Sequence, residues 1–323
     1  MASTGIQTGS TIDGFLIGEL IHEGGMATLR SVTRPDIDFP ILMKLPRILE
    51  GRDPAAIVGF EMERMILPRI SGVHVPRFVA AGDINLQPYV VMERMTGPSL
   101  HAKLDHLPLP YPEVAAIGVR VATALDDLHR QGVIHLDVKP SNIVMRETGE
   151  AVLVDYGLAR HDRLPDLMEE QFRIPYGTGP YMAPEQILGV RRDARSDLFA
   201  LGVLLYFFST GVRPFGEPTG RRRLRKRLWR DPVPPRKRNA DLPLWLQEVI
   251  LRCLEVDPAR RHPTAARLAF DLAHPDDVKL TGRSERLMPD PWSIAIRRRF
   301  DRDAAALVLK HAVAARRTPA DEP

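Results

Sequence analysis

The 323-residue chain contains a single cysteine, Cys253, and so cannot form an internal disulfide. Disulfides are confined mainly to oxidising compartments, and a lone thiol therefore favours a reducing one, the cytoplasm. Cys253 lies within the apolar pattern Leu251–Leu254. This pattern predicts a buried structural thiol rather than a nucleophile.

Long apolar runs are also missing, and the first residues do not show the pattern of a secretory signal. The longest apolar run, Leu198–Phe208, falls well short of the roughly 20 residues that a transmembrane helix needs. Residues 1–14 are polar and lack the basic and apolar regions of a signal peptide. The chain is nevertheless 44% hydrophobic, which is ordinary for a globular protein and argues against wholesale disorder. We therefore expect a globular chain without a transmembrane segment.

Four polar residues stand at the ends of short apolar runs between residues 133 and 157. They are Asp137, Lys139, Asn142 and Asp155. One carboxylate can orient a hydroxyl nucleophile and the ammonium can hold a transferring phosphoryl group, while the amide and the second carboxylate can bind Mg²⁺. The structural alternative is a pair of polar turns in an α/β protein. The order and spacing of the four residues favour phosphoryl transfer.

Residues 135–142 read His-Leu-Asp-Val-Lys-Pro-Ser-Asn, and residues 155–157 read Asp-Tyr-Gly. They resemble the catalytic loop His-Arg-Asp-Leu-Lys-Pro-x-x-Asn and the metal loop Asp-Phe-Gly of eukaryotic-like (Hanks-type) serine/threonine protein kinases. The triplet Ala-Pro-Glu at 183–185 follows, as the activation segment of that family requires. The resemblance covers about residues 12–274 and is strongest to the soluble bacterial kinases of this group.

The resemblance implies an α+β, two-lobed protein-kinase-like fold, with a small β-rich N-lobe that carries helix C and a larger, mainly helical C-lobe. A chain of 323 residues suits two lobes and an extension. The expected parts are a flexible N-terminus at 1–11, the N-lobe at 12–95, the C-lobe at 96–274 and a C-terminal helical extension or tail at 275–323.

Residues 22–26 read His-Glu-Gly-Gly-Met and are expected to join two strands over the nucleotide. Glycine lets backbone N–H groups approach phosphate oxygens closely. Of the three glycines in the family pattern Gly-x-Gly-x-x-Gly-x-Val only one remains, because His22 and Ala27 replace the first and the third. Taken alone, this segment would be interpreted as a plain hairpin turn.

Lys44 ends an apolar strand, where an ammonium group is costly to bury without a carboxylate partner. The resemblance makes Lys44 the residue that holds the α and β phosphates and Glu63, on the following helix, its partner. Glu61 is the alternative partner. Glu61 is the less favoured partner of Lys44, because its position relative to the apolar residues of the helix fits the pairing less well than that of Glu63.

The resemblance also locates the adenine pocket. Leu42 replaces the alanine that normally lies against the adenine ring, and overpacking of this type costs about 1–3 kcal/mol when a site cannot relax. Met92 takes the gatekeeper position, and the backbones of Glu93 and Met95 are expected to contact adenine. The expected nucleotide-binding residues are Ile21, Gly24, Gly25, Met26, Leu29, Leu42, Lys44, Glu63, Met92, Glu93 and Met95.

Leu136 occupies the place of the family arginine that receives a phosphate from the activation segment. A leucine cannot form such a charge-assisted contact. We therefore predict that activity does not require phosphorylation of the activation loop through this route. By resemblance, Thr178 bonds the catalytic aspartate and lysine, Glu185 pairs with Arg261, and Asp197 anchors the catalytic loop.

Residues 221–230 read Arg-Arg-Arg-Leu-Arg-Lys-Arg-Leu-Trp-Arg, at the position of helix G, where this family often docks substrates. The run is interpreted either as a docking surface for an acidic protein, an anionic membrane or nucleic acid, or as a solvated helix with Leu224, Leu228 and Trp229 packed inward. The net charge of only +4 and the lack of a nucleic-acid motif favour the solvated helix and make nucleic acid an unfavoured partner.

The C-terminal segment lies beyond the resemblance. Residues 292–300 and 304–315 are expected to form amphipathic helices that dock on the large lobe or on a partner; an interfacial membrane helix is the alternative.

The residues as a whole favour an active serine/threonine protein kinase that uses ATP with Mg²⁺, or Mn²⁺, on protein substrates. Asp137 would accept the hydroxyl proton, Lys139 would stabilise the transferring phosphoryl group, and Asn142 and Asp155 would bind the metal. Two alternatives remain. A pseudokinase that binds nucleotide or acts as a scaffold is favoured by the changed glycine loop and Leu42. A small-molecule phosphotransferase fits less well with the segment at 177–185.

Overall fold

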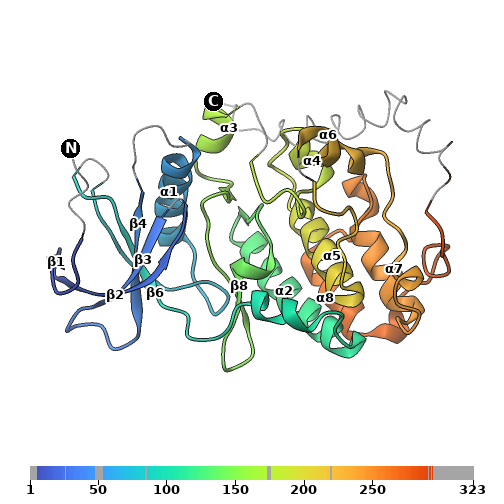
Figure 1. The fold of residues 1–323 in the computed structure, drawn as a ribbon, viewed down its shortest axis with the longest axis horizontal. Coiled ribbons are helices and arrows are strands. Elements are labelled where there is room, and N and C mark those ends of the chain that lie inside the picture. The colour runs from blue at the N-terminus through green and yellow to red at the C-terminus, as the bar shows by residue number, and fades with distance from the viewer. Residues whose placement is uncertain are drawn as a thin grey trace, which may run out of the picture.

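The computed structural model describes residues 6–289 except 26, 48–53, 84–85, 173–175 and 219, together with residues 291 and 293. These residues form a β-rich lobe and a helical lobe that are joined by the chain after residue 93 (Figure 1). Met26 and nearly all of the two helices expected at 292–300 and 304–315 lie outside the described residues.

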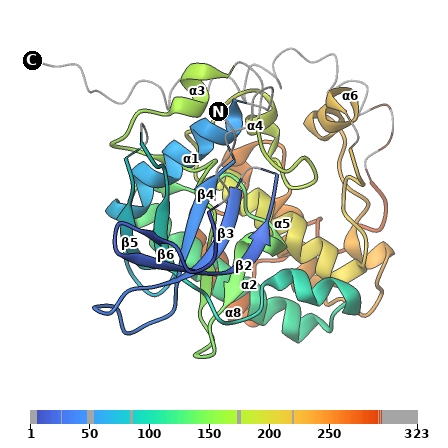
Figure 2. The same ribbon diagram turned by 60° about the vertical axis from the view of Figure 1, so that its left-hand side comes forward.

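The smaller lobe is built on a six-stranded antiparallel sheet with the strand order β1-β2-β3-β4-β6-β5. Its strands are β1 Thr11–Ile12, β2 Phe15–Glu23, β3 Ala27–Thr33, β4 Ile41–Pro46, β5 Phe78–Ala81 and β6 Val90–Glu93. Ile41, Met43 and Leu45 of β4 are buried on one face of the sheet. Because side chains alternate along a strand, Leu42 and Lys44 lie on the opposite face. Helix α1, Ala55–Ile66, lies across the sheet and contacts β4 (Figure 2).

Residues 9 and 10 are part of the β-rich lobe. The backbone N–H of Gly9 donates to Ile17 O at 2.8 Å, and the N–H of Ile17 donates to Ser10 O at 2.9 Å. Residues 9 and 10, expected in the flexible N-terminus, are therefore paired with β2. Strand β2 has backbone groups on this edge that would otherwise lack partners.

The larger lobe is mainly helical. Its helices are α2 Tyr111–Arg130, α3 Leu167–Gln171, α4 Pro184–Ile187, α5 Arg195–Thr210, α6 Arg221–Leu224, α7 Leu244–Cys253 and α8 Ala265–Ala273. Two small antiparallel sheets have two strands each. One pairs β7 Val133–Ile134 with β10 Arg160–His161, and the other pairs β8 Ile143–Met145 with β9 Ala151–Leu153. Short 3₁₀ helices include η2 Leu100–His106, η3 Pro140–Asn142, η4 Arg225–Leu228 and η6 Pro258–Arg260. The two-lobed α+β architecture is the one that the sequence predicts.

Helix α5 forms the centre of the larger lobe. It is buried on nearly all sides, as its apolar sequence requires, and it packs against α2, α7 and α8 (Figure 1). Val114, Ile117 and Val121 of α2 recur at helical spacing and are buried in the same core. Within the described part of the chain, none of the helices is both long enough and apolar enough to cross a bilayer.

Cys253 ends α7 and is fully buried in this core. Its Sγ lies 3.5 Å from Nδ1 of the buried His262. Burial raises the pKa of the Cys253 thiol to about 12. The thiol is therefore protonated and inaccessible, as the apolar sequence around it predicts.

The chain that follows α8 returns to α7. Nε2 of Gln247 lies 2.8–2.9 Å from the carbonyl oxygens of Arg283, Ser284 and Arg286, and Thr281 Oγ1 donates to Glu248 at 2.8 Å. Residues 281–286 are therefore fixed to the helical lobe by buried polar groups of α7.

Candidate active site

The catalytic loop runs between β7 and β8 and is held by Asp197, in the first turn of α5. Oδ1 of Asp197 accepts from Leu136 N at 2.8 Å, and Oδ2 accepts from His135 N at 2.9 Å. Leu136 has a φ of +61°, in the left-handed region, which costs of order 1–3 kcal/mol for a residue other than glycine. Its carbonyl accepts from Gln186 Nε2 at 2.9 Å. These bonds on both sides hold the strained backbone of Leu136, and the anchoring by Asp197 that the sequence predicts is present.

Asp137, the next residue, is the centre of a hydrogen-bond network. Its Oδ2 accepts from Lys139 Nζ at 2.6 Å and from Asn142 Nδ2 at 3.1 Å. Its Oδ1 accepts from Thr178 N at 3.1 Å and from Thr178 Oγ1 at 2.7 Å. Thr178 Oγ1 also lies 3.0 Å from Lys139 Nζ. The carboxylate is therefore held in one orientation by the catalytic loop and by the activation segment.

Lys44 of β4 joins the two lobes at the site. Its Nζ forms an ion pair with Oε2 of the buried Glu63 on α1 and lies 3.0 Å from Asp155 Oδ1. Glu61 instead pairs with Arg64 at 2.6 Å on the other side of α1. The pairing of Lys44 with Glu63, which the sequence favours over Glu61, is present.

Lys44 and Asp155 each stabilise the charged form of the other. Burial disfavours the Lys44 ammonium, but the nearby Asp155 and Glu63 outweigh burial and raise its pKa. The Lys44 charge lowers the pKa of Asp155 to about 2, against the opposing effect of burial. Both groups are therefore ionised at neutral pH, the state in which they can bind a phosphate and a cation.

Helix α1 approaches the metal loop closely because both carry glycine at the point of contact. A Cβ on Gly59 would lie 3.1 Å from Gly157 O. The N–H of Tyr156 donates to Glu63 Oε1 at 3.3 Å, and the Tyr156 hydroxyl donates to Leu153 O at 3.0 Å. Tyr156, which stands where the family has phenylalanine, is thus fully buried with its hydroxyl bonded.

The residues expected around adenine lie along β4, β6 and the segment that follows. Leu42 and Met92 face each other across the pairing of β4 with β6, and Met92 is buried. Met95 is half-buried two residues after β6. Gly97 follows, where an added Cβ would lie 1.7 Å from Met145 O, so only glycine fits there. This contact brings the connecting segment against β8.

The carboxylate of Glu93 is bound between the lobes. Arg146, just after β8, donates from Nη1 and Nη2 to its two oxygens at 2.6 and 3.0 Å, and Arg77 N donates at 3.1 Å. The side chain of Glu93 is buried, so only its backbone remains for a ligand. Arg146 belongs to no motif of the sequence, and the sequence gives no signal for this ion pair.

The remaining expected residues lie on the β2–β3 hairpin. Ile21 lies on β2 and Leu29 on β3. Gly24 begins the turn, where its N–H donates to Ala27 O at 3.0 Å, and Gly25 follows. Met26 lies outside the described residues.

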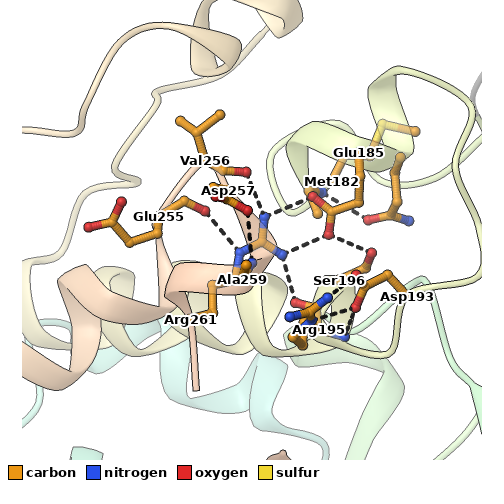
Figure 3. Close-up of polar contacts among 12 residues, drawn as sticks. Met182, Glu185, Asp193, Arg195, Ser196, Glu255, Val256, Asp257, Ala259 and Arg261 are labelled. Atoms are coloured by element: carbon orange, nitrogen blue, oxygen red, sulfur yellow. Dashed lines mark hydrogen bonds and ion pairs between the residues drawn. The ribbon is translucent and has the colours of Figure 1, made fainter. Parts of the chain in front are cut away.

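A buried ion pair between Glu185, at the end of the activation segment, and Arg261, just after η6, links this segment to the helical lobe (Figure 3). The two Arg261 Nη atoms bind the Glu185 oxygens at 2.7 and 2.8 Å. The other donors reach the carbonyl oxygens of Arg195, Val256 and Glu255 at 2.8, 3.2 and 2.9 Å. The guanidinium has five N–H groups, and these five contacts use them all.

The basic run at 221–230 forms α6 and η4 rather than one helix. Arg227 is buried there, whereas Leu224, Leu228 and Trp229, expected to pack inward, are only partly buried. Arg227 Nη1 donates to Met182 O and, at 3.2 Å, to Pro180 O. Among the described residues its Nε and Nη2 have no hydrogen-bond partner, and burial lowers its pKa to about 10. The residues of the run that remain exposed are Arg222, Arg223, Arg225, Lys226 and Arg230.

Comparisons with known proteins agree with this geometry. A family model described as protein kinase domain matches residues 42–271. The probable serine/threonine-protein kinase CPE1738 of Clostridium perfringens is 30% identical over 79% of this chain and 37% of its own length. Serine/threonine-protein kinase PknB of Mycolicibacterium smegmatis is 31% identical over 85% of this chain and 46% of its own length. The chain thus spans less than half the length of these relatives.

A solved structure supports the fold independently. The crystal structure of the Mycobacterium tuberculosis PknI kinase domain matches with a TM-score of 0.65 and 23% sequence identity. The match covers 84% of this chain and 99% of that domain. It confirms the predicted two-lobed architecture and, at this identity, says nothing about substrates.

Proposed function

Because the chain belongs to the protein kinase domain family, we propose that it transfers the γ-phosphoryl group of ATP to serine and threonine hydroxyls of proteins. One observation carries the proposal: the Asp137 carboxylate is oriented by Lys139, Asn142 and Thr178. Such an arrangement is suited to phosphoryl transfer, where catalysis is mostly positioning and electrostatic stabilisation. The cytoplasm, which supplies ATP, is the compartment that we propose.

Each residue has a role in the proposed reaction. Asp137 orients the substrate hydroxyl and accepts its proton. Lys139, beside it, stabilises the charge on the transferring phosphoryl group. Lys44, placed by Glu63, holds the phosphates that stay on the nucleotide. The nucleotide lies between the β2–β3 hairpin and the segment that contains Met92 and Met95, where backbone groups meet adenine.

Asn142 and Asp155 have the chemistry of a magnesium site. Asn142 uses its Nδ2 to donate to the Asp137 backbone and side chain at 3.1 Å, so its amide oxygen, which also accepts from Ser141 Oγ at 3.4 Å, is the atom that can bind a cation. Asp155 is ionised, and Lys44 contacts its Oδ1. Both residues offer hard oxygen ligands, which Mg²⁺ prefers. When bound, the metal would neutralise charge on the phosphates.

The proposal is tested by transfer of labelled γ-phosphate from ATP, in the presence of Mg²⁺, to a generic basic protein and to the chain itself. We expect transfer by the wild-type protein and its loss in Asp155→Ala, because that variant lacks a metal ligand and a partner of Lys44. Thermal unfolding checks that both proteins are folded. A folded wild-type protein that transfers nothing would contradict the proposal and favour a nucleotide-binding scaffold.

Phosphorylation of the activation segment is proposed to be unnecessary, because the buried Leu136 cannot bind a phosphate. The residues of the segment that carry hydroxyls are also held in the fold: Thr178 bonds Asp137, Tyr181 is buried, and the ring of Tyr176 packs on that of Phe172 with their centroids 4.7 Å apart. We therefore expect phosphatase treatment to change kcat by less than about twofold. Mass spectrometry verifies that the treated protein carries no phosphate. A kcat that falls by roughly tenfold on dephosphorylation would contradict this expectation.

The exposed part of the basic run is proposed to dock an acidic segment of the protein substrate. Arg227 fixes the run against Pro180 and Met182, next to the segment that carries Thr178. Cations at this place would attract acidic residues of a substrate whose hydroxyl lies on Asp137.

Reversing two charges of the run tests this docking. For the double variant Arg222→Glu/Lys226→Glu, we expect the KM for an acidic protein substrate to rise roughly tenfold, with kcat little changed. The difference should shrink at high salt, which screens exposed charges. Arg260→Glu/Lys279→Glu reverses two exposed charges elsewhere and is the matched control. An equal change of KM in both double variants would contradict docking at the run.

A further inference from the structure

A buried ion pair ties the activation segment to the helical lobe. Asp166, at the N-cap of α3, accepts from Arg191 Nε at 3.1 Å through Oδ1 and at 2.8 Å through Oδ2. Arg191 lies in the loop between α4 and α5. The exposed fractions of Asp166 and Arg191 are only 7% and 9%, so water screens this pair little.

Arg191 also reaches the metal loop. Its Nη2 donates to the carbonyl of Leu158 at 2.9 Å, and Leu158 directly follows the Asp-Tyr-Gly triplet. One guanidinium therefore joins three pieces of chain: the end of the metal loop, the start of α3 and the α4–α5 loop. Arg192 adds a weaker contact to Glu169 of α3, at 3.5 Å.

The helix that Asp166 caps lies beside α1. Both ribbon views place α3 next to α1, and the two helices are in contact (Figures 1 and 2). Met168 of α3 is buried in the large hydrophobic core. Because α1 carries Glu63, the position of α3 bears on the ion pair between Glu63 and Lys44.

We infer that the Asp166 carboxylate, docked on Arg191, holds the activation segment in its catalytic position and replaces the phosphate that Leu136 cannot bind. The inference rests on the proposed kinase function. Asp166 and Arg191 are then positioning residues, since neither contacts Asp137 or Lys139 in the described structure. A carboxylate is always present, so the segment is held without a modifying enzyme.

Asp166→Asn is the sharpest variant for a test. An asparagine still caps α3 through its side-chain oxygen, which accepts from Glu169 N at 3.2 Å in the wild type, but it loses the charge that pairs with Arg191. Glu170→Gln removes an exposed charge from the same helix and is the matched control. Arg191→Met removes the other partner, and Arg191→Lys restores its charge.

Two measurements are made on each variant: kcat and KM for ATP, and hydrogen exchange of residues 158–172. We expect Asp166→Asn and Arg191→Met each to lower kcat by about tenfold and to lose exchange protection in this segment, with KM changed less than about twofold. The double variant should be no worse than either single one, because the two residues act as a unit. Arg191→Lys should recover part of both signals, and Glu170→Gln should match the wild type.

Unchanged kcat and exchange in Asp166→Asn would overturn the inference. So would a uniform loss of protection across both lobes, since that would mark the pair as part of general stability alone. The exchange measurement needs no catalysis. If the wild-type protein transfers no phosphate, the proposed function fails, and the exchange of residues 158–172 still decides whether Asp166 and Arg191 hold the segment.

Discussion

Asp137→Asn is expected to lower kcat by on the order of 10²–10⁴-fold, the usual contribution of a general base. Asparagine keeps the shape of the side chain but loses the charge and one accepting oxygen. In the wild type, Oδ2 accepts from Lys139 at 2.6 Å and from Asn142 at 3.1 Å, and an amide nitrogen in that place cannot accept from either. The substitution therefore removes the proton acceptor and also disturbs Lys139.

The measurement is steady-state transfer of labelled phosphate with ATP and the protein substrate varied in turn. The KM for ATP should change little, because Lys44 and the hairpin, not Asp137, are proposed to hold the nucleotide. Asp105→Asn makes the same chemical change at an exposed position of η2 and should behave as the wild type. A folded Asp137→Asn protein that keeps its kcat would remove Asp137 from the mechanism.

The second large effect is on stability. Glu185→Gln leaves the Arg261 guanidinium buried without its counter-charge, and breaking a buried pair in this way costs about 3–5 kcal/mol. Ser196 Oγ, which donates to Glu185 Oε1 at 2.7 Å, loses a charged acceptor as well. The midpoint of thermal unfolding should fall by roughly 5–15 °C.

Urea unfolding followed by circular dichroism measures this loss. Glu113→Gln is the matched control, because Glu113 pairs with Lys103 at 2.9 Å on the exposed surface, where such pairs contribute at most about 1 kcal/mol. If Glu185→Gln does not fold, Arg261→Lys keeps a charge at the site and should give an intermediate loss. Equal stabilities of Glu185→Gln and Glu113→Gln would contradict the structural role of the pair.

The sequence predicts best those contacts whose two partners both lie in motifs. Lys44 with Glu63, Glu185 with Arg261, and Thr178 with Asp137 are all present, although the partners are far apart in the chain. For Lys44, burial of its charge demands a carboxylate partner, and in all three pairs the resemblance to the kinase motifs names the partner.

Contacts outside the motifs could not be predicted in this way. Asp166 with Arg191, like Glu93 with Arg146, pairs common surface residue types at arbitrary separation, so many other partners were equally plausible from sequence. Arg227 shows a different limit of prediction from the sequence. Helical spacing favoured inward leucines, but the carbonyl groups of Pro180 and Met182 need donors, and an arginine supplies them. Tertiary hydrogen bonding overrides periodicity there.

The bond between Glu93 and Arg146 restricts how the two lobes move. The bond links the two lobes next to the segment that connects them. Glu93 ends β6, which pairs with β4 in the small lobe, and Arg146 belongs to the helical lobe. Separation of the lobes along their long axis would break this partly buried charge pair, whereas rotation about the pair would not. We therefore expect the two lobes to open mainly by rotation about this pair.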